Sequence, residues 1–458
     1  MIIRLTFNYS IQVDDREQIL LAQELLLGYP IPQPPLYSWL SFIFFKSIGV
    51  GLLSLSLLKY ILIFLTFYFI HKVAALSNDH PKHSALITYS FLLLPSFGWH
   101  MHQGFTHTIL LGLGIIMTFY YFLKIENSGE LKDYFLLGIA ISIGVLSKYS
   151  FIIFLTIFFT TIIVSKSFRA KIVTYKFLVT MMIATILLTP HTLWIIDNWN
   201  DIWGWASARL KVSSVKEEAS FIANLYNLGK AYIGFLSPLI LFPLFGFRKF
   251  FRPRIRPKTT LEKFLDYFVL IIIIVTINFA IFFDIAHIRV RWLHPILMLF
   301  PFWFYIKFSS RYSIKTKDIR FFVIVLISFT LLILNIRIAQ NTFGPSLGYY
   351  GRLNVPILPT LKELPRETLA NVSTIKTSDD NLGAHLLSLF ESKEIIIDNK
   401  KFNSDKRDIK LNCLITWDID GSHDSNISNE FIDKNQVYEI INNKYRLYYT
   451  IKDIKSCF

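Results

Sequence analysis

The sequence is poor in charge and in cysteine. Only 17% of its 458 residues are charged, whereas a soluble chain carries about 25%. This composition excludes a disordered chain, and the presence of only two cysteines excludes a scaffold built from disulfides. Hydrophobic residues make up 53% of the sequence, and the mean hydropathy is +0.46. Because an ordinary soluble enzyme does not have this composition, we expect a protein that lies mostly in a lipid bilayer.

Acidic residues are scarcer than basic ones, 32 against 47, and the formal net charge is +15. Residues 340–458 hold 15 basic and 16 acidic side chains, so the excess of positive charge lies in the apolar part of the chain. There the basic residues gather in short loops, as the positive-inside rule expects of a membrane protein. This placement argues against a nucleic-acid partner and for contact with membrane lipid.

A helix that spans a membrane needs about 20 mostly apolar residues. Ten apolar segments are candidates for such spans, and some of them are shorter. They are residues 52–70, 84–94, 104–123, 134–146, 150–165, 175–189, 228–247, 264–283, 293–306 and 321–338. The loops 166–176, 248–263 and 307–320 are strongly basic, so we expect them to be cytoplasmic. The other loops then face outside, which in a bacterium is the periplasm. Segment 34–49 is short and begins with proline, which favours an interfacial helix over a span.

Residues 340–458 have the pattern of a small soluble α/β domain. We expect strands at residues 371–377, 394–397, 411–417 and 444–451 and a helix at 382–390. The predicted fold class is therefore mainly α: a polytopic membrane helix bundle at 1–339, with an outer catalytic loop at 1–50, followed by this periplasmic domain. For Cys413 and Cys457, the sequence favours a disulfide bond and two free thiols about equally.

The densest polar cluster consists of Asp14, Asp15, Arg16 and Glu17, just before an apolar run. One interpretation is a solvated helix start, because the helix dipole favours acidic residues in the first turn. The other is a general base, which needs a carboxylate held near its target and a pKa tuned by a drier site. On the second interpretation, Asp14, Asp15 and Glu17 are the catalytic candidates.

A proline-rich loop and three histidines also lie on the outer side. Four prolines stiffen residues 28–36, which form either a connector or a substrate-facing loop containing Tyr29 and Gln33. The histidines are His100, His102 and His107, and imidazole is a common zinc ligand. Their spacing matches no zinc motif, so a hydrogen bond or a phosphate contact is favoured over a metal.

Basic residues at the outer boundary predict contacts with an anion. Lys148, which precedes Tyr149, either snorkels to the interface or binds a lipid phosphate. Arg289 and Arg291 break the positive-inside pattern, and an anionic ligand such as a phosphate gives a reason for this. His191 begins the long outer loop, whose four tryptophans form either a membrane belt or a surface for stacking sugars.

The order of these motifs resembles that of GT-C glycosyltransferases of the protein O-mannosyltransferase-like superfamily (family 39). This superfamily includes the bacterial aminoarabinose and galacturonic-acid transferases that modify lipid A. The similar stretches are DDREQILLAQELLLGYPIPQPPLYSWL, GVLSKYSF, TPHTLW and RVRWLHP, and the resemblance covers residues 13–308. Family members have a membrane span before the acidic loop, but only 13 residues precede Asp14. We therefore expect either a misplaced start or a truncated relative.

The resemblance also implies roles for particular residues. The catalytic Asp of the family falls on Asp14 and its neighbouring Glu on Asp15, with Glu17 as a supporting carboxylate. Gln33 stands where some relatives have a lysine. We expect donor-phosphate contacts from Lys148, Tyr149, His107, Arg289 and Arg291, and substrate contacts from Tyr29, Gln33, His102 and His191.

The expected function is inverting transfer of a sugar, hexosyl or uronosyl, from a polyprenyl-phosphate donor to a hydroxyl of a periplasmic acceptor. The acceptor is lipid A, another lipopolysaccharide glycan or a protein, and the enzyme lies in the bacterial inner membrane. No cofactor is assigned, and a divalent metal stays open. Two alternatives are an inactive, N-terminally truncated relative that binds lipid-linked sugar, and a lipid transporter. Transport is less favoured, because transporters usually carry charges near the bilayer midplane or repeated halves.

Overall fold

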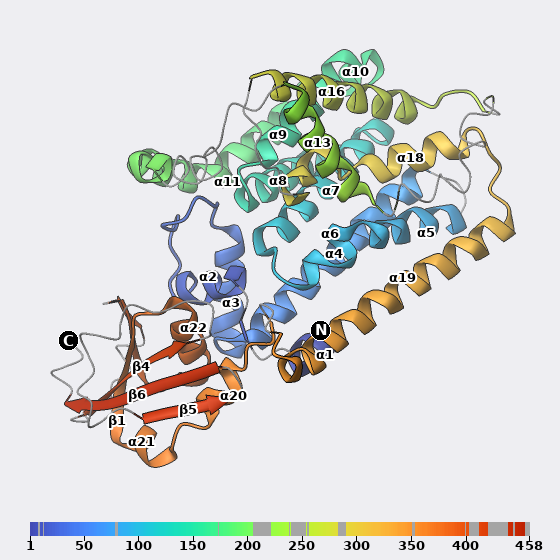
Figure 1. The fold of residues 1–458 in the computed structure, drawn as a ribbon. Coiled ribbons are helices and arrows are strands. Elements are labelled where there is room, and N and C mark those ends of the chain that lie inside the picture. Colours follow the sequence, from blue (N-terminus) through green and yellow to red (C-terminus); the bar gives the residue numbers. More distant parts are fainter. Residues whose placement is uncertain are drawn as a thin grey trace. The chain divides into compact units, whose positions relative to one another are not determined.

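The structure is a computed structural model in which the chain forms two compact units. The first unit comprises Met1–Leu25, Ser38–Tyr60 and Leu332–Phe458, and the second comprises Leu26–Tyr37 and Ile61–Leu331. The described residues are 1–7, 10–11, 13–77, 81–172, 174–204, 221–237, 239, 253, 256–282, 290–349, 353–398, 400–402, 412–419, 438–442 and 445–453. Helices α4 (Leu52–Ser77) and α19 (Thr316–Phe343) contribute to both units (Figure 1).

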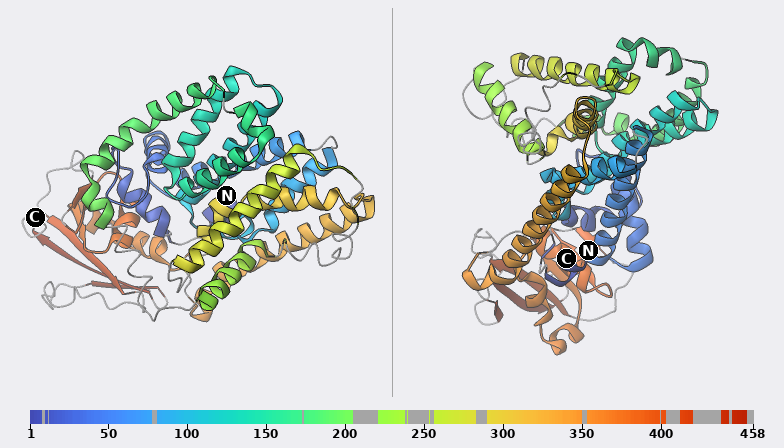
Figure 2. Two further views of the ribbon diagram at one scale, coloured as in Figure 1. Left: turned by 90° about the horizontal axis from the view of Figure 1, so that it is seen from above. Right: turned by 90° about the vertical axis from the view of Figure 1, so that its right-hand side faces the viewer.

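The elements of secondary structure described in the second unit are all helices or 3-10 turns. Its longest helices pack side by side, with α8 between α7 and α11 (Figure 2). The α-helices that belong to this unit alone are α5 (Pro81–Ser90), α6 (Pro95–Gly98), α7 (Thr106–Asn127), α8 (Leu131–Ser147), α9 (Phe151–Val164), α10 (Lys166–Ile172), α11 (Phe177–Asp197), α13 (Phe221–Leu236), α16 (Thr260–Phe282), α17 (His294–Leu297) and α18 (Phe300–Ser309). Short 3-10 turns lie at η1 (Phe91–Leu93), η2 (His100–His102) and η3 (Val290–Leu293).

Most residues of helix α7 are buried. Where α7 crosses α8, Gly114 faces Gly144, and a Cβ at position 114 would lie 2.5 Å from the Gly144 Cα. The two glycines therefore let the helix backbones approach closely, as small residues do between membrane helices. Elsewhere on α7 the ring of Phe122 lies 4.9 Å, between centroids, from each of Phe158 and Phe264. The unit is thus held by close backbone contact together with a core of aromatic rings.

Five described helices are long and apolar enough to cross a membrane: α4, α7, α11, α16 and α19. A sixth is counted if α9 and α10, bent by 106° around Ser165, form one span. These helices correspond to six of the ten predicted segments, and the chain is a multi-pass membrane protein.

The other four predicted segments do not form single described helices of spanning length. Segment 293–306 is divided into α17 and α18, with Pro295 and Pro301 in their first turns. Segment 84–94 ends as α5 gives way to a 3-10 turn, and segment 134–146 is the 17-residue helix α8. Segment 228–247 runs beyond the described residues after 237, apart from 239. Segment 34–49 forms α3 (Leu36–Ile48), an apolar helix of 13 residues.

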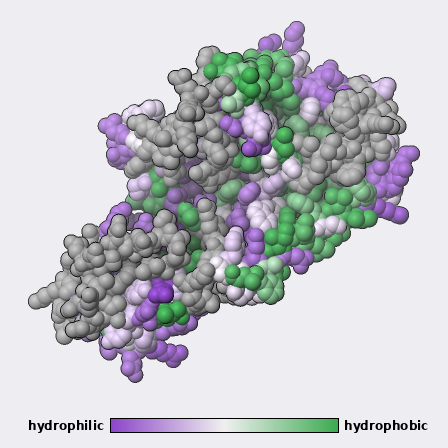
Figure 3. Space-filling model, viewed as in Figure 1, coloured by the Kyte–Doolittle hydropathy of each residue, from purple (hydrophilic) through white to green (hydrophobic). Residues whose placement is uncertain are grey.

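Helix α19 turns its apolar side chains outward. Only 6% of its most apolar 18-residue window is buried inside the protein. Figure 3 shows the apolar surface that these side chains form along the helix. Such a surface is stable only where lipid rather than water covers it.

A mixed six-stranded sheet forms the end of the first unit, in the order β3-β2-β1-β4-β6-β5. The parallel strands are β1 (Val372–Thr377), β2 (Glu394–Ile397) and β4 (Asn412–Ile419). The antiparallel additions are β3 (Lys400–Phe402), β5 (Tyr438–Asn442) and β6 (Tyr445–Asp453). The predicted mainly α fold class with a small C-terminal α/β domain is confirmed. Cys413 in β4 is buried and disulfide-bonded, whereas Cys457 lies outside the described residues.

Helix α22 (Asp380–Leu389) joins β1 to β2, because parallel neighbours need a crossover connection. Asp379 caps its start: the carboxylate accepts a hydrogen bond from the Leu382 N–H at 2.6 Å. The predicted helix 382–390 and the four predicted strands all match described elements. Strands β3 and β5 were not predicted, nor were the short helices α20 (Ile357–Lys362) and α21 (Arg366–Asn371).

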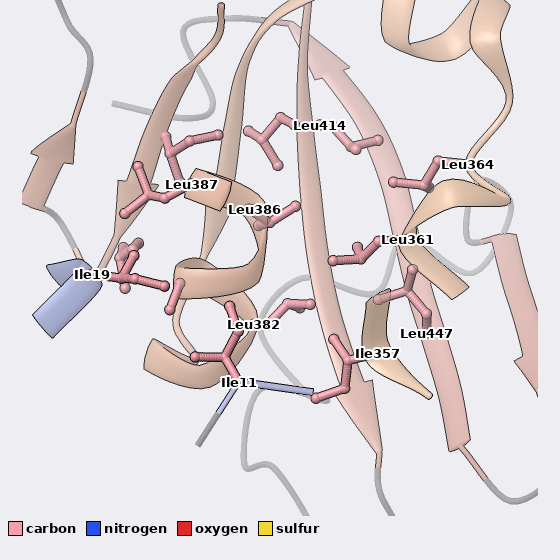
Figure 4. Packing of buried hydrophobic residues seen from close by; sticks show 14 of the residues in the cluster. Ile11, Ile19, Ile357, Leu361, Leu364, Leu382, Leu386, Leu387, Leu414 and Leu447 are labelled. Atoms are coloured by element: carbon pink, nitrogen blue, oxygen red, sulfur yellow. The ribbon is translucent and has the colours of Figure 1, made fainter. Parts of the chain in front are cut away.

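One hydrophobic core joins the sheet to the beginning of the chain. Leu382, Leu386 and Leu414 lie in the same buried cluster as Ile11 and Ile19 (Figure 4). Phe45 and Leu55 belong to this cluster as well. The first unit therefore combines segments from both sides of residue 340, and the division of the chain at that residue stays a prediction.

We predict that Leu447→Ala destabilises the first unit by about 2–5 kcal/mol, because Leu447 is fully buried in this core and the substitution leaves a cavity. The control is Ile441→Ala on the neighbouring strand, where the side chain is 57% exposed. It should change the free energy of unfolding by about 0.5 kcal/mol or less. The thermal midpoint of the purified full-length protein in detergent measures both. Equal midpoints for the two variants would contradict the described packing.

Candidate active site

The acidic cluster lies on the short helix α2 (Val13–Leu21) of the first unit. Asp14 and Asp15 occupy the first turn, where the helix dipole favours negative charge. Asp15, Gln18 and Ile19 are fully buried, whereas Asp14 and Glu17 are partly exposed. Residues one turn apart share a face, so α2 has a buried face with Asp15 and a partly exposed face with Asp14 and Glu17.

Asp15 is held by two cations. The guanidinium of Arg4 donates through Nη2 to Asp15 Oδ2, and the Lys59 ammonium lies 3.3 Å from Oδ1. The side chains of Asp15 and Lys59 are 0% exposed and that of Arg4 is 3% exposed. Buried charges need such partners, because removal from water is costly. Asp15 is therefore fixed in place by ion pairs that link α1 (Ile2–Phe7), α2 and α4.

Arg4 and Lys59 were missed by the sequence analysis. Lys59 did carry a signal, since a lysine inside a predicted span usually has a specific partner. Arg4 carried none, because its partner depends on how α1 packs. A second anchor of α2 was missed too: the Ser38 hydroxyl donates to Gln18 Oε1 at 2.8 Å and ties α2 to α3.

In the second unit, the start of α7 meets the junction of α8 and α9. The ammonium of Lys148 donates to Thr108 Oγ1 at 3.0 Å, and His107 Nδ1 lies 3.2 Å from the Ser147 carbonyl oxygen. The ring of Tyr37 lies 5.6 Å from the ring of His107. A lysine and a histidine thus gather beside the N-terminus of a 22-residue helix, where the helix dipole favours negative charge.

Tyr149 and His191 form a second contact in this unit. The Tyr149 hydroxyl lies 3.1 Å from His191 Nε2, and His191 Nδ1 lies 2.9 Å from the Leu27 carbonyl oxygen. Because a carbonyl only accepts, Nδ1 carries the hydrogen and Nε2 accepts from the tyrosine. Burial raises the pKa of Tyr149 to about 12, so its hydroxyl remains a donor at neutral pH.

The loop before α3 packs against α11 next to this contact. A Cβ on Gly28 would lie 2.1 Å from the Trp194 ring, so only glycine fits at that position. The Trp194 ring stacks on His191 at 5.7 Å and an interplanar angle of 13°. Tyr29 follows in the loop and is 1% exposed, and the Gln33 side-chain oxygen is buried with no hydrogen-bond partner in the described structure.

The remaining predicted residues are His102, Arg289 and Arg291. His102 lies in the 3-10 turn η2 and is partly exposed. The backbone of Arg291 belongs to η3, and Arg289 lies outside the described residues. Among the residues that the structure describes, no three His, Cys, Asp or Glu side chains are grouped to hold a metal ion. The predicted carboxylates belong to the first unit, and the predicted phosphate and substrate contacts belong to the second.

His294 was quoted within a motif but given no role, and the structure buries it fully. Its ring is 5.2 Å from that of Phe235, 6.0 Å from Phe97 and 6.4 Å from Phe105. Neither ring nitrogen has a hydrogen-bond partner within the described structure. Phe105 itself has a φ of 66°, a left-handed conformation that is uncommon for a residue with a bulky side chain.

Comparison with known proteins places this geometry in context. A family model described as "Dolichyl-phosphate-mannose-protein mannosyltransferase" matches residues 32–194. The lipopolysaccharide core galacturonosyltransferase RgtB of Rhizobium johnstonii is 27% identical over 84% of this chain and 77% of its own length. RgtA of the same organism, also a lipopolysaccharide core galacturonosyltransferase, is 24% identical over 87% of this chain and 79% of its own length.

Two solved structures share the fold. ArnT from Cupriavidus metallidurans bound to undecaprenyl phosphate has a TM-score of 0.61 at 11% identity, covering 98% of this chain and 95% of that one. The apo form of the same protein has a TM-score of 0.59 with the same coverage. The chain has the fold of these GT-C structures and is a membrane glycosyltransferase. The resemblance noted in its motifs is confirmed, and so is the prediction that it is an enzyme.

The two aspartates of this glycosyltransferase differ in what they contribute to stability. We predict that Asp15→Asn destabilises the protein by about 3–5 kcal/mol, because it leaves the buried cations Arg4 and Lys59 without their anion. Asp14→Asn is the matched control, with the same chemical change one residue away on the partly exposed face, and should alter stability by about 0.5 kcal/mol or less. Thermal unfolding of the two purified variants provides the comparison. If the Asp14 variant is the less stable, the ion-pair assignment is wrong.

Proposed function

We propose that this enzyme transfers a uronosyl or hexosyl group from a polyprenyl-phosphate donor to a hydroxyl of the lipopolysaccharide core or lipid A. The observation that carries the proposal is the similarity to two lipopolysaccharide core galacturonosyltransferases along 84% and 87% of the chain. The structural neighbour bound to undecaprenyl phosphate supports a donor of that class. A protein acceptor is the second candidate, favoured by the description of the matching family model.

The proposed location is the bacterial inner membrane, with residues 1–50, which include Asp14, Asp15 and Glu17, on the periplasmic side. The basic loops 166–176, 248–263 and 307–320 support this orientation through the positive-inside rule. The donor then arrives already assembled at the outer leaflet, and the enzyme needs no nucleotide.

In the proposed mechanism Asp14 is the general base. Its carboxylate takes the proton of the acceptor hydroxyl as the acceptor oxygen attacks the anomeric carbon. The bond from that carbon to the phosphate oxygen breaks in the same displacement. The configuration at the anomeric carbon inverts, and polyprenyl phosphate leaves with the bonding electron pair. Asp14 suits this role because α2 presents it on its partly exposed face.

Asp15 and Glu17 have supporting roles in this scheme. Asp15 is already engaged by Arg4 and Lys59 and has no exposed surface, so it fixes the rotation of α2 and thereby the direction of Asp14. Glu17 shares the partly exposed face with Asp14, one turn further along the helix. It is assigned as a second carboxylate beside the proposed base.

The leaving phosphate is assigned to the basic groups of the second unit. Lys148 and His107, at the start of α7, would stabilise the negative charge that develops on polyprenyl phosphate. Arg289 and Arg291 are assigned to the same anion from the sequence. Tyr149 is assigned to the donor phosphate from the sequence; because its hydroxyl hydrogen goes to His191, its oxygen would accept from a sugar hydroxyl beside the phosphate. Substrate contacts are assigned to Tyr29, Gln33, His102 and His191.

We predict that Asp14→Asn lowers kcat by at least about 10²-fold, because the acceptor hydroxyl loses its base. Purified enzyme is supplied with a panel of polyprenyl-phosphate sugars and lipopolysaccharide. Mass spectrometry then reports an addition of hexose or uronic-acid mass. Glu24→Gln, which removes an exposed carboxylate just beyond α2, is the control and should keep the wild-type rate. Transfer by the Asp14 variant at the wild-type rate would remove Asp14 as the base.

A second prediction concerns Lys148. Lys148→Ala should weaken binding of undecaprenyl phosphate by roughly 10-fold or more, since a charge-assisted hydrogen bond contributes about 1.5–3 kcal/mol. Lys132→Ala removes an ammonium whose side chain is 70% exposed, and it should leave the affinity unchanged. Equilibrium binding of the labelled lipid phosphate in detergent measures both. Equal affinities for the two variants would remove Lys148 from the phosphate site.

A further inference from the structure

Helix α22, which packs on the C-terminal sheet, contacts the backbone just before α2, the helix that carries Asp14 and Asp15. The Ile11 N–H donates a hydrogen bond to His385 Nε2 at 2.8 Å, across 374 residues of sequence. His385 is 0% exposed and Ile11 is 3% exposed, so water does not compete for this bond. Asp14, the proposed base, follows Ile11 by three residues.

The imidazole of His385 is suited to accept this bond. Its Nδ1 lies 2.6 Å from the carbonyl oxygen of Asn381, one turn earlier on α22. A carbonyl only accepts, so Nδ1 carries the hydrogen and Nε2 keeps the lone pair that the Ile11 N–H requires. Burial, together with the charge of Arg16 on α2, lowers the pKa of His385 to about 4 against the opposing effect of the hydrogen bond to Asn381, so the ring is neutral at neutral pH.

Apolar side chains also meet where α2 and the residues before it pack on α22. Figure 4 shows Ile11 and Ile19 directed at α22, where Leu382, Leu386 and Leu387 meet them in one buried cluster. Apolar packing is not directional, so it does not by itself fix the backbone just before α2, whereas the ion pairs of Asp15 hold the rotation of the helix. A hydrogen bond fixes direction, because its strength falls steeply away from linear geometry.

We propose that His385 is a positioning residue for the reaction: from the C-terminal domain it fixes the start of α2 and so directs Asp14. This inference rests on the proposed function, because it assumes that Asp14 acts on the acceptor hydroxyl. His385 itself touches no reacting atom in this scheme. Its contribution is the alignment of the base, and small misplacements of a catalytic group are costly in rate.

The test uses three substitutions in the full-length enzyme. His385→Leu keeps apolar bulk and removes the acceptor. His385→Gln places an amide oxygen near the position of Nε2, whereas His385→Asn is an equally polar amide that is too short to reach Ile11. The control, Ser388→Ala, removes a different hydrogen bond of α22, the one from the Ser388 hydroxyl to the His385 carbonyl oxygen.

Two readouts are measured on each variant. Amide hydrogen exchange in peptides covering residues 10–21 reports how firmly α2 is held. Steady-state transfer gives kcat and the KM for the polyprenyl-phosphate sugar. We expect His385→Leu and His385→Asn to raise exchange about 10-fold, equivalent to about 1.4 kcal/mol, and to lower kcat about 10-fold or more. The KM should stay within about twofold, and His385→Gln and Ser388→Ala should resemble the wild type in both readouts.

Several results would overturn the inference. Unchanged exchange in both His385→Leu and His385→Asn would show that the hydrogen bond does not hold α2. Faster exchange with an unchanged kcat would separate the position of α2 from the reaction. A defect in His385→Gln equal to that of His385→Leu would mean that ring shape matters rather than an acceptor. If His385→Leu does not fold, the comparison of Gln with Asn decides alone.

Failure of the proposed function is recognised separately. If Asp14→Asn transfers sugar at the wild-type rate, Asp14 is not the base and the catalytic part of the inference falls with it. Hydrogen exchange does not depend on the reaction, so it still decides whether His385 holds α2.

Discussion

The structure around helix α2 depends on a set of charged side chains that are buried away from water. Asp15 lies between Arg4 and Lys59, and none of the three side chains has appreciable exposure. Such charges are tolerated only when they are paired, so α1, α2 and α4 must meet at this point. Once Asp15 faces inward, the helical repeat turns Asp14 to the partly exposed side. Two neighbouring aspartates thereby receive different environments, one buried in ion pairs and one partly exposed.

In the second unit, the close approach of helices α7 and α8 decides which side chains meet. Gly114 and Gly144 bring the backbones of α7 and α8 together, and the end of α8 then lies beside the start of α7. Lys148 reaches Thr108 there, and the Ser147 carbonyl reaches His107. Side chains with different positions in the sequence therefore gather because two helices approach closely, not because any of them carries a motif by itself.

Much of the fold could be predicted, and the reasons are local. Apolar residues recur with the period of a strand in β1, β2, β4 and β6 and with the period of a helix in α22. The structure has these same elements. Strands β3 and β5 are short and exist through pairing with β2 and β6, which a local pattern does not reveal. The single span expected at 293–306 is divided into α17 and α18, each with a proline in its first turn. The length of an apolar run does not reveal such a break. At the site, the phosphate contacts expected of Lys148 and His107 stay predictions, and the sequence did not indicate the difference in burial between Asp14 and Asp15. That difference follows from the ion pairs of Asp15 with Arg4 and with Lys59, which is 44 residues away in sequence.

The core shared by the C-terminal sheet and the acidic loop limits how such enzymes can diversify. Ile11 and Ile19 pack on α22 within the core that includes Leu414 and Leu447. A tail exchanged between two relatives, or lost through a premature stop, would leave these two isoleucines facing water and the acidic helix without its support. Recombination at residue 340 would therefore separate Ile11 and Ile19 from the sheet on which they pack. Natural chimaeras of this architecture should carry the acidic loop and the tail from the same parent.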